Sequence, residues 1–448
     1  MANYGEMILS KVIEANEVKA LSRFNVTEQD FQTPEEKDAY SFILTYSKQN
    51  RGNAPDYRTL VSEVEGFNFR PEVTDSFDYM ARKLKEYSTQ VRMLELLQGR
   101  ASAQFENMNG FDFASWLKDE ITHIEQQTNY RTKVGTDLVH DTKDFLAEYK
   151  ARKEGTSFKV WNSAFPSMNE AIGGYLSGNV YTWYGRSGRG KSVFTMVEAL
   201  EAALQGATVL VWAMEMSKYE WLARAYAYLS AKEEMKEHEV SGTSYLAGFE
   251  ANQLLRGNMS DVDEKKFEEF LGNLNNIIQG KIIIRAVDDA DFYVRGTKQL
   301  ESDILQVGAD VCIVDPIYYM DMDRNTSNVA GGDVANTSKR IRHIAGHTKC
   351  VIHLITQAEE VRNDKNESGE RQLQAPERAE IKKTKAVLED ATNTFGIDTC
   401  DGRFLIKIGK GRNGGEGTEI EGTFLAGIGY IKEHSAEELA EQFEDFGF

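Results

Sequence analysis

The sequence predicts an α/β protein with an all-helical N-terminal domain and a second domain built on a mostly parallel central sheet. Three observations support this fold class. Apolar residues recur at helical spacing through residues 1–130. From Val160 onward, short apolar runs alternate with helical patterns, as they do in open parallel sheets. One of these runs leads into the glycine-rich segment 185–192, whose spacing is that of a phosphate-binding loop.

Length and composition limit the kind of protein. A chain of 448 residues is long enough for two or three domains, each with its own core. Hydrophobic residues make up 41% and charged residues 27%, as in ordinary globular proteins. No apolar run approaches the roughly 18 residues of a membrane helix, and the N-terminus lacks a signal-peptide pattern. We therefore expect a cytoplasmic protein that does not associate with membranes.

The charge and the cysteines exclude some classes of function. A net charge of −19 argues against a surface that coats polyanions, but a channel for nucleic acid needs only a local basic lining. Cys312, Cys350 and Cys400 are far apart in the sequence, and the first two lie in apolar runs. We interpret them as core residues, with neither a zinc site nor a disulfide framework.

We divide the chain into four parts. Residues 1–130 are a helical assembly domain, 131–157 a linker, 158–432 the domain that carries the phosphate-binding loop and 433–448 an acidic tail. The linker carries an amphipathic helix over 136–153, whose apolar stripe must pack on its own chain or on a neighbouring subunit.

Within these parts, local patterns predict individual elements. In the first domain, Pro34 after Thr33 is typical of a helix start. The polar stretch Ala358–Leu388 is expected to be a mobile loop that carries function. Six strands are expected, at Val180–Tyr184, Thr208–Met214, Lys281–Ala286, Val311–Asp315, Val351–Thr356 and Phe404–Gly409.

The phosphate-binding loop indicates a nucleoside triphosphatase. In this pattern, backbone N–H groups and the N-terminus of the following helix bind phosphate oxygens. Lys191 would reach the β- and γ-phosphates, and the Ser192 hydroxyl would ligate Mg²⁺. The predicted nucleotide-binding residues of the loop are Gly185, Ser187, Gly188, Arg189, Gly190, Lys191 and Ser192.

Three later strands end in polar residues, where ligands of open α/β sheets bind. Glu215 could orient or deprotonate an attacking water, or simply begin the next helix as a surface residue. Asp315 suits a magnesium-associated acid. Gln357 could bond the γ-phosphate, although the pattern alone favours an ordinary loop residue.

Basic residues gather at three places. Lys410 and Arg412 precede a glycine turn and could stabilise charge on a transferred phosphoryl group, or form a plain basic hairpin. The pairs Lys382-Lys383 and Lys339-Arg340 belong to two clusters that suggest contact with nucleic-acid phosphates, although most short charge runs are solvated faces. The first cluster comprises Lys382, Lys383, Thr384 and Lys385.

Together these segments resemble the DnaB-type replicative helicases, which belong to the RecA-like hexameric ATPases. The resemblance covers nearly the whole chain. It rests mainly on Val209-Leu210-Val211-Trp212-Ala213-Met214-Glu215-Met216-Ser217 with the downstream Arg224, and on Ile408-Gly409-Lys410-Gly411-Arg412-Asn413-Gly414. Leu388-Glu389-Asp390-Ala391 is similar to the acidic stretch that follows the family's DNA-binding loop.

The resemblance implies roles for these residues. Glu215 matches the catalytic carboxylate, Asp315 the magnesium acid and Gln357 the sensor at the strand tip. Lys410 and Arg412 match cations that act on the ATP of the neighbouring subunit. The implied cofactors are ATP and Mg²⁺, with Arg224 also at the nucleotide, and the 382–385 cluster matches the loop that grips single-stranded DNA.

The resemblance also implies partners. It predicts a homo-hexamer that encircles single-stranded DNA, moves 5′ to 3′ and unwinds forked DNA. The helix in the linker matches one that docks on the adjacent subunit. The acidic tail, which ends in Phe446 and Phe448, is hypothesised to recruit a primase, a helicase loader or a polymerase.

The sequence departs from the family at several positions. Pro316 follows Asp315 where an aromatic is usual, Glu359 and Glu360 replace an Asn-Arg pair, and Lys385 replaces a glycine. This divergence suggests a phage protein, acting in the host cytoplasm. Two alternatives stay open from sequence: a RecA- or KaiC-like ATPase without unwinding activity, and a nucleotide-gated adaptor.

Overall fold

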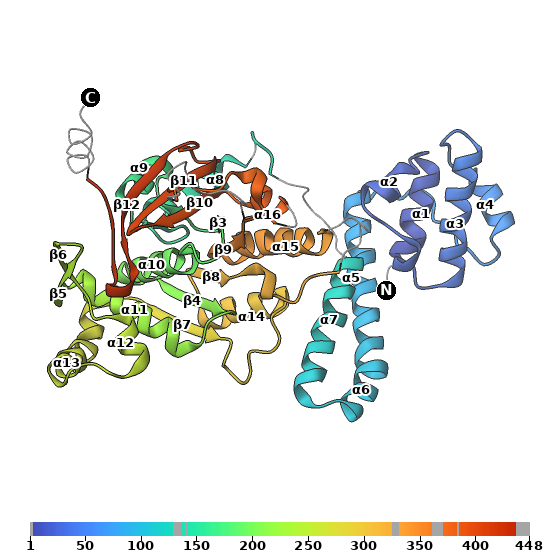
Figure 1. Cartoon of the computed structure of the whole chain (residues 1–448). Helices are drawn as coiled ribbons and strands as arrows, with labels where there is room; N and C mark the ends of the chain where they lie inside the picture. Colours follow the sequence, from blue (N-terminus) through green and yellow to red (C-terminus); the bar gives the residue numbers. More distant parts are fainter. Residues whose placement is uncertain are drawn as a thin grey trace. The chain divides into compact units, whose positions relative to one another are not determined.

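The computed structural model describes residues 3–128, 136–139, 141–324, 331–360, 371–382 and 385–435. The chain divides into two compact units, Met1–Thr142 and Lys143–Phe448 (Figure 1). The division falls within the residues predicted as a linker.

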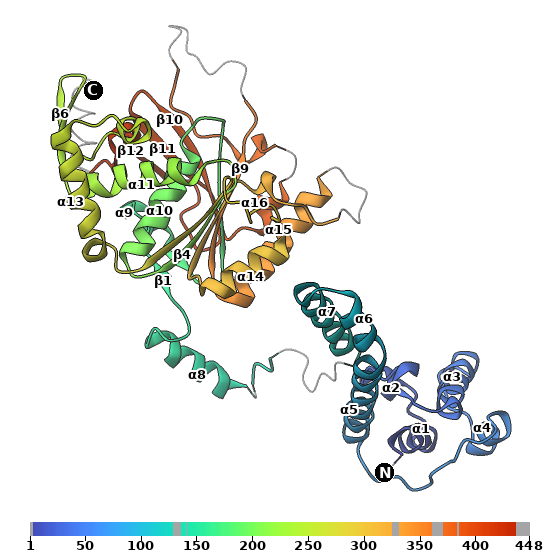
Figure 2. The ribbon, with the colours of Figure 1, turned by 90° about the horizontal axis from the view of Figure 1, so that it is seen from below.

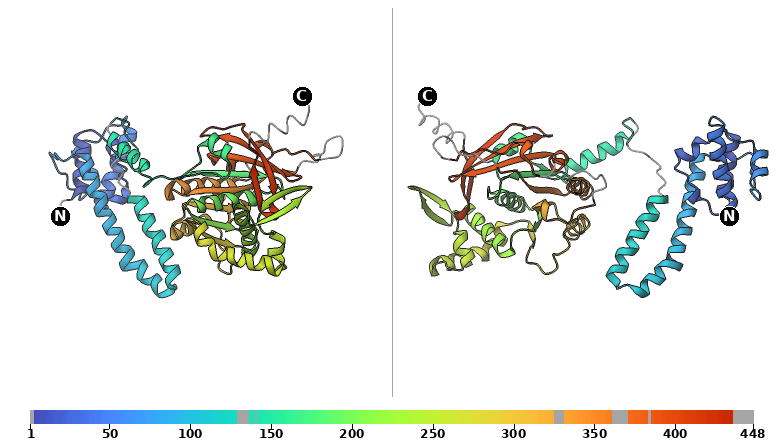
Figure 3. Two further views of the ribbon diagram at one scale, coloured as in Figure 1. Left: turned by 90° about the vertical axis from the view of Figure 1, so that its left-hand side faces the viewer. Right: turned by 45° about the vertical axis from the view of Figure 1, so that its right-hand side comes forward.

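The described part of the first unit is entirely helical, as predicted. As expected, α3 begins at Pro34, and the Thr33 side chain accepts a hydrogen bond from the backbone N–H of Glu36. Figure 3 shows α5 and α7 as long helices that lie side by side. The helices are α1 (Tyr4–Glu14), α2 (Lys19–Arg23), α3 (Pro34–Gln49), α4 (Tyr57–Glu63), α5 (Phe77–Glu95), α6 (Ser102–Asn107) and α7 (Gly110–Thr128), with a π-helical turn at Leu96–Ala101 and a 3₁₀ turn at Glu28–Asp30.

The linker helix is shorter than predicted. Helix α8 spans Thr142–Lys153, so its first turn lies six residues after the expected start at 136. The Asp137 carboxylate accepts a hydrogen bond from the backbone N–H of Val139, and this local bond competes with helix formation. The apolar side chains of α8, Phe145, Leu146 and Tyr149, are exposed.

A nine-stranded sheet dominates the described part of the second unit. The strands lie in the order β13-β12-β11-β10-β3-β9-β8-β4-β7. The six strands from β10 to β7 are parallel, and β11, β12 and β13 add an antiparallel extension. The strands are β3 (Val180–Gly185), β4 (Thr208–Ala213), β7 (Lys281–Ala286), β8 (Val311–Asp315), β9 (Val351–Gln357), β10 (Asn393–Cys400), β11 (Arg403–Gly411), β12 (Glu419–Leu425) and β13 (Tyr430–Glu433).

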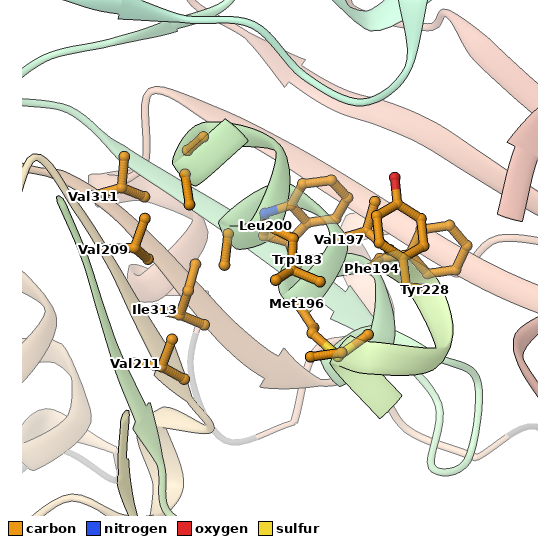
Figure 4. Close-up of a cluster of buried hydrophobic side chains, with 14 of the residues drawn as sticks. Trp183, Phe194, Met196, Val197, Leu200, Val209, Val211, Tyr228, Val311 and Ile313 are labelled. Carbon is orange, nitrogen blue, oxygen red and sulfur yellow. The ribbon is translucent and has the colours of Figure 1, made fainter. Parts of the chain in front are cut away.

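Helices cover both faces of this sheet (Figure 2). Helices α10 and α11 pack on one face, and α14 and α15 on the other. Figure 4 shows side chains of α10 and α11, including Phe194 and Tyr228, facing those of the central strands. The helices are α9 (Pro166–Ile172), α10 (Lys191–Leu204), α11 (Lys218–Lys232), α12 (Ala251–Arg256), α13 (Asp261–Ile277), α14 (Thr297–Val307), α15 (Gly332–Thr348) and α16 (Ala386–Asp390).

All six predicted strands are present, but the sequence analysis missed several others. Strand β10 was missed because it is polar, although it lies at the centre of the sheet and is almost wholly buried. Its Asp398 carboxylate is paired with the Arg371 guanidinium, which offsets the cost of burial. Two small antiparallel pairs were also missed, β1 (Val160–Trp161) with β2 (Tyr175–Leu176) and the hairpin of β5 (Lys236–Val240) with β6 (Thr243–Ala247).

The expected end of the ATPase domain is also corrected. Glu433 is the last residue of β13 and accepts hydrogen bonds from Ser167, so the tail starts after this residue and not at it. The tail beyond Ser435, with its two terminal phenylalanines, lies outside the described residues.

Candidate functional site

The strand register brings the predicted site residues to one edge of the sheet. Strands β3, β9, β8 and β4 are neighbours, and all four are parallel. Gly185 is paired with Gln357, and Ala213 is paired with Asp315. Because the carboxyl ends of parallel strands meet at the same edge, the phosphate loop, Gln357 and Asp315 converge there.

The phosphate loop needs glycine at defined positions. Gly188 and Gly190 have φ angles of +69° and +83°, in the left-handed region that favours glycine. A Cβ atom on Gly190 would also lie 3.0 Å from the Phe424 ring. At Gly185, a Cβ atom would lie 2.8 Å from the carbonyl oxygen of Ile397. The loop is therefore shaped by its own backbone and by close packing against β10 and β12.

Lys191 is the first residue of α10, and its side chain is directed back to the loop. The Nζ atom donates a hydrogen bond to the carbonyl oxygen of Arg186, at 2.7 Å. Burial lowers the pKa of Lys191, and the nearby carboxylates of Asp315 and Glu215 oppose this effect. The ammonium group thus lies among the groups predicted to bind phosphate and metal.

Asp315 and Ser192 have the arrangement expected of a magnesium site. Burial raises the pKa of Asp315 to about 6, while a hydrogen bond from the Ser192 hydroxyl lowers it. The Oδ1 atom of Asp315 is buried and has no hydrogen-bond partner among the described residues. A free buried carboxylate oxygen beside a hydroxyl fits Mg²⁺, which commonly takes one or two protein ligands and completes its shell with water and phosphates.

A cavity of about 600 Å³ unites the site. Glu215, at the end of β4, is exposed in it, and Arg224 lines it while forming an ion pair with Glu220 at 2.6 Å. Of the residues predicted to bind nucleotide or metal or to act in hydrolysis, the cavity is lined by Ser187, Gly188, Arg189, Gly190, Lys191, Ser192, Glu215, Arg224, Asp315 and Gln357.

The sequence analysis missed one wall of this cavity. Asn252 and Leu255 come from α12, and Phe424 comes from the end of β12. The Phe424 ring stacks on Phe194 of α10, with 5.3 Å between ring centroids. These residues belong to segments far from the phosphate loop in sequence, and no motif marks them. Only the tertiary fold brings them to the site.

Lys410 and Arg412 do not line this cavity. The Lys410 ammonium donates hydrogen bonds to the carbonyl oxygens of Leu388, Glu389 and Ala391, at 3.2, 2.6 and 2.7 Å. Lys410 therefore binds the carbonyl end of α16 in its own chain. Burial, followed by the Arg412 charge, lowers the pKa of Lys410. The Arg412 side chain forms no ion pair or hydrogen bond with the described part of the chain.

The basic clusters lie on the side of the sheet that carries α15 and α16, which pack together. Lys339 and Arg340 are exposed on α15, Lys385 is exposed just before α16, and Lys382 is half-buried. Lys383 and Thr384 lie outside the described residues.

Two of the departures from the family pattern have structural counterparts. A cis peptide bond joins Asp315 to Pro316, and a short 3₁₀ helix follows at Ile317–Tyr319. The Glu360 carboxylate accepts a hydrogen bond, 2.9 Å long, from the backbone N–H of Ser187 in the phosphate loop.

No metal cluster of three or more His, Cys, Asp or Glu side chains occurs in the described ranges. Within the same ranges, no helix combines the length and apolarity that crossing a bilayer requires.

Comparisons with known proteins bear on the family of the chain. Residues 161–419 match the family model of the DnaB-like helicase C terminal domain. No curated protein sequence matches the chain. Among solved structures, the chain is similar to "The Structure Of A DnaB-Like Replicative Helicase And Its Interactions With Primase", with 14% identity and a TM-score of 0.67. That match covers 96% of this chain and 98% of the other.

A second solved structure, of an ATPase domain, is also similar, with 14% identity and a TM-score of 0.51, over 67% of this chain and 100% of the other. At this level of identity the structural matches show a shared fold, whereas the family model spans more than half of the chain. The chain therefore belongs to the DnaB-like helicase family and is an ATP-hydrolysing replicative DNA helicase.

Proposed function

We propose that this helicase hydrolyses ATP at a seam between two subunits of a homo-hexameric ring. The observation that carries the proposal is the cavity in which Lys191, Ser192, Glu215 and Asp315 converge, while Arg412 lies outside it on the same chain. Arg189 and Arg224 line the cavity, but Arg412, the cation expected at the transferred phosphoryl group, does not, and a second copy of the chain would supply it.

Each residue then has a role in the chemistry. Lys191 binds the β- and γ-phosphates, and Ser192 and Asp315 would hold Mg²⁺, which would neutralise phosphate charge. Glu215 orients and deprotonates the attacking water, since it is exposed in the cavity at the end of β4. Gln357 detects the γ-phosphate from the tip of β9.

A mixing experiment tests the shared seam. Lys191→Ala removes the lysine of the phosphate loop, and Arg412→Ala removes the cation supplied to the neighbour, so each variant alone should lack ATPase activity. In a mixture, some seams join an intact loop of one variant to an intact Arg412 of the other. We expect activity to reappear on mixing. If the mixture stays inactive while both variants still form rings, Arg412 does not act across the seam.

A second experiment tests the base. Glu215→Gln keeps the shape of the side chain but removes its charge. We expect nucleotide binding to persist and turnover to fall by about 10²- to 10⁴-fold. The matched control is Glu220→Gln, which alters a carboxylate at the same cavity that already pairs with Arg224. Equal turnover in Glu215→Gln and the wild type would refute the assignment.

We further propose that Lys382, Lys385, Lys339 and Arg340 bind the phosphates of single-stranded DNA, with Lys383 and Thr384 in the same loop. Their support is the positive charge that they carry on one side of an otherwise acidic protein, with Lys339, Arg340 and Lys385 exposed. Binding should be largely independent of sequence and should weaken as salt increases. The expected 5′-to-3′ direction is tested by comparing the unwinding of two duplexes, one with a single 5′ tail and one with a single 3′ tail.

The exposed apolar face of α8 is proposed to dock on the adjacent subunit. Phe145, Leu146 and Tyr149 are 72%, 54% and 57% exposed. A group of exposed apolar side chains marks an interaction surface, whereas a single one is ordinary. Phe145→Ser should therefore shift the protein from rings to smaller species in analytical ultracentrifugation. Rings of unchanged stability would argue against this docking.

A primase, loader or polymerase is proposed to bind the acidic tail in the cytoplasm, in a phage-infected cell if the protein is of phage origin. A pull-down with and without residues 437–448 tests the tail, because its deletion should weaken recruitment and spare ATPase activity.

A further inference from the structure

The segment that leads into the basic loop is fastened to the phosphate loop. We call the described residues 371–382 the strap, since they end at Lys382 of the proposed DNA-binding loop. The Arg186 guanidinium, from the phosphate loop, donates to the carbonyl oxygen of Gln374 at 3.1 Å and to the Glu380 carboxylate at 3.3 Å. Arg186 is only 4% exposed, so water does not compete strongly for this bond.

The end of the strap is also held by the end of β9, which carries the sensor, and by the turn that follows the magnesium acid. The backbone N–H of Lys382 donates to the carbonyl oxygen of Gln357 at 3.1 Å. Its carbonyl oxygen accepts a hydrogen bond from the Tyr318 hydroxyl at 2.8 Å. Tyr318 lies in the 3₁₀ turn that follows Asp315. The backbone of Lys382 is therefore bound on both sides by segments that leave the nucleotide site.

Arg186 also contacts the group that nucleotide would engage. Its carbonyl oxygen accepts the hydrogen bond from the Lys191 ammonium. Phosphate oxygens compete for that ammonium, because bonds between ionised groups are stronger than a bond to a neutral carbonyl. Arg186 also retains a buried Nε–H without a hydrogen-bond partner among the described residues. When Lys191 changes partner, the peptide whose side chain holds the strap therefore loses a hydrogen bond.

We infer that the Arg186–Glu380 ion pair transmits nucleotide binding to the DNA-binding loop. Binding of the triphosphate draws Lys191 away from the Arg186 carbonyl, the guanidinium shifts with its backbone, and the strap moves Lys382 through Glu380. Glu380 is a positioning residue here, because it contacts neither nucleotide nor DNA. This inference rests on the proposed role of Lys382 and Lys385 in binding DNA.

The test measures coupling between two ligands at equilibrium. Affinity of the full-length protein for a fluorescent oligothymidylate is measured by anisotropy, with and without a non-hydrolysable ATP analogue. The ratio of the two affinities is the coupling, which typically amounts to about 5- to 150-fold. By linkage, the oligonucleotide must change the affinity for the analogue by the same factor, and this gives an independent readout.

Glu380→Gln is the decisive variant, since it keeps the size of a partly exposed side chain and removes the charge that Arg186 binds. We expect the ratio to fall toward one, with affinity for the analogue alone within about twofold of the wild type. Tyr318→Phe removes the second fastening and should lower the same ratio. The matched control is Glu377→Gln, because Glu377 lies one turn earlier in the strap and pairs with Lys407, outside the nucleotide site.

Different results would contradict the role of the Arg186–Glu380 ion pair and the proposed DNA contact of Lys382 and Lys385. An unchanged ratio in both Glu380→Gln and Tyr318→Phe would overturn the inference, as would an equal loss in Glu377→Gln. A double Lys382→Ala, Lys385→Ala variant should bind the oligonucleotide at least about threefold less tightly in both nucleotide states. If it binds normally, the proposed DNA contact is wrong, whatever Glu380→Gln shows.

Discussion

Asp315→Asn should stabilise the nucleotide-free protein at neutral pH while abolishing its activity. Burial raises the pKa of this carboxyl from 3.8 to about 6. Each pH unit corresponds to about 1.4 kcal/mol, so ionising Asp315 costs the folded state about 3 kcal/mol. Asparagine has nearly the same shape and does not carry this cost.

The raised pKa of Asp315 determines how its contribution to the unfolding free energy depends on pH. Because the folded protein holds the proton more tightly than the unfolded chain, the contribution of Asp315 to stability is full below pH 3.8 and declines as the pH rises to about 6. The difference in unfolding free energy between Asp315→Asn and the wild type should therefore grow across this window. Above it, the difference should level off at about 3 kcal/mol.

The assay is unfolding in urea, monitored through tryptophan fluorescence. The buried Trp183 and Trp212 report on the ATPase unit. Denaturation curves are recorded for both proteins at several pH values without nucleotide or Mg²⁺. Glu416→Gln is the matched control, because that carboxylate is exposed in the same unit and does not line the cavity. A stability difference that does not vary with pH between about 4 and 7 would refute this account of the Asp315 site.

Three further predictions follow from contacts in the same unit. Gly190→Ala should cost about 1–3 kcal/mol of stability in thermal melts and weaken nucleotide binding, because the residue has φ +83° and its Cβ would press on Phe424. Lys410→Met should lower the melting temperature even without nucleotide, since the ammonium binds three carbonyl groups at the end of α16; an unchanged melt would show that these hydrogen bonds do not add to stability. Burial raises the pKa of Glu198 from 4.5 to about 8 against the hydrogen bond from Ser163, so the stability gain of Glu198→Gln in urea should increase over that pH range and then stay constant.

Much of the nucleotide site was predictable because its signals are local. A phosphate loop needs a strand, glycines with positive φ and a helix N-terminus, and all three lie within residues 180–204. Glu215, Asp315 and Gln357 follow buried apolar strands, so their place at the edge of a parallel sheet could be inferred from pattern. The structure brings these residues into one cavity, as that reasoning requires.

Other parts of the site had no local signal. Phe424 belongs to an antiparallel strand that follows the parallel part of the sheet, and it reaches the phosphate loop only because β10, β11 and β12 bring it back. Lys410 was predicted as a cation for a neighbouring subunit, and sequence spacing could not show that it binds the end of α16. Such contacts depend on strand order, which a linear pattern does not contain.

The sequence by itself determined the fold class, the phosphate loop and the acids that follow the strands, because backbone conformation and hydrophobic periodicity are set by neighbouring residues. The tertiary structure alone decided which charges meet. It paired Arg186 with Glu380, far away along the chain, and buried Asp398 beside Arg371 in a strand too polar to be recognised. The physical reason is that a buried charge is tolerated only where folding supplies its partner, and that partner comes from another part of the chain.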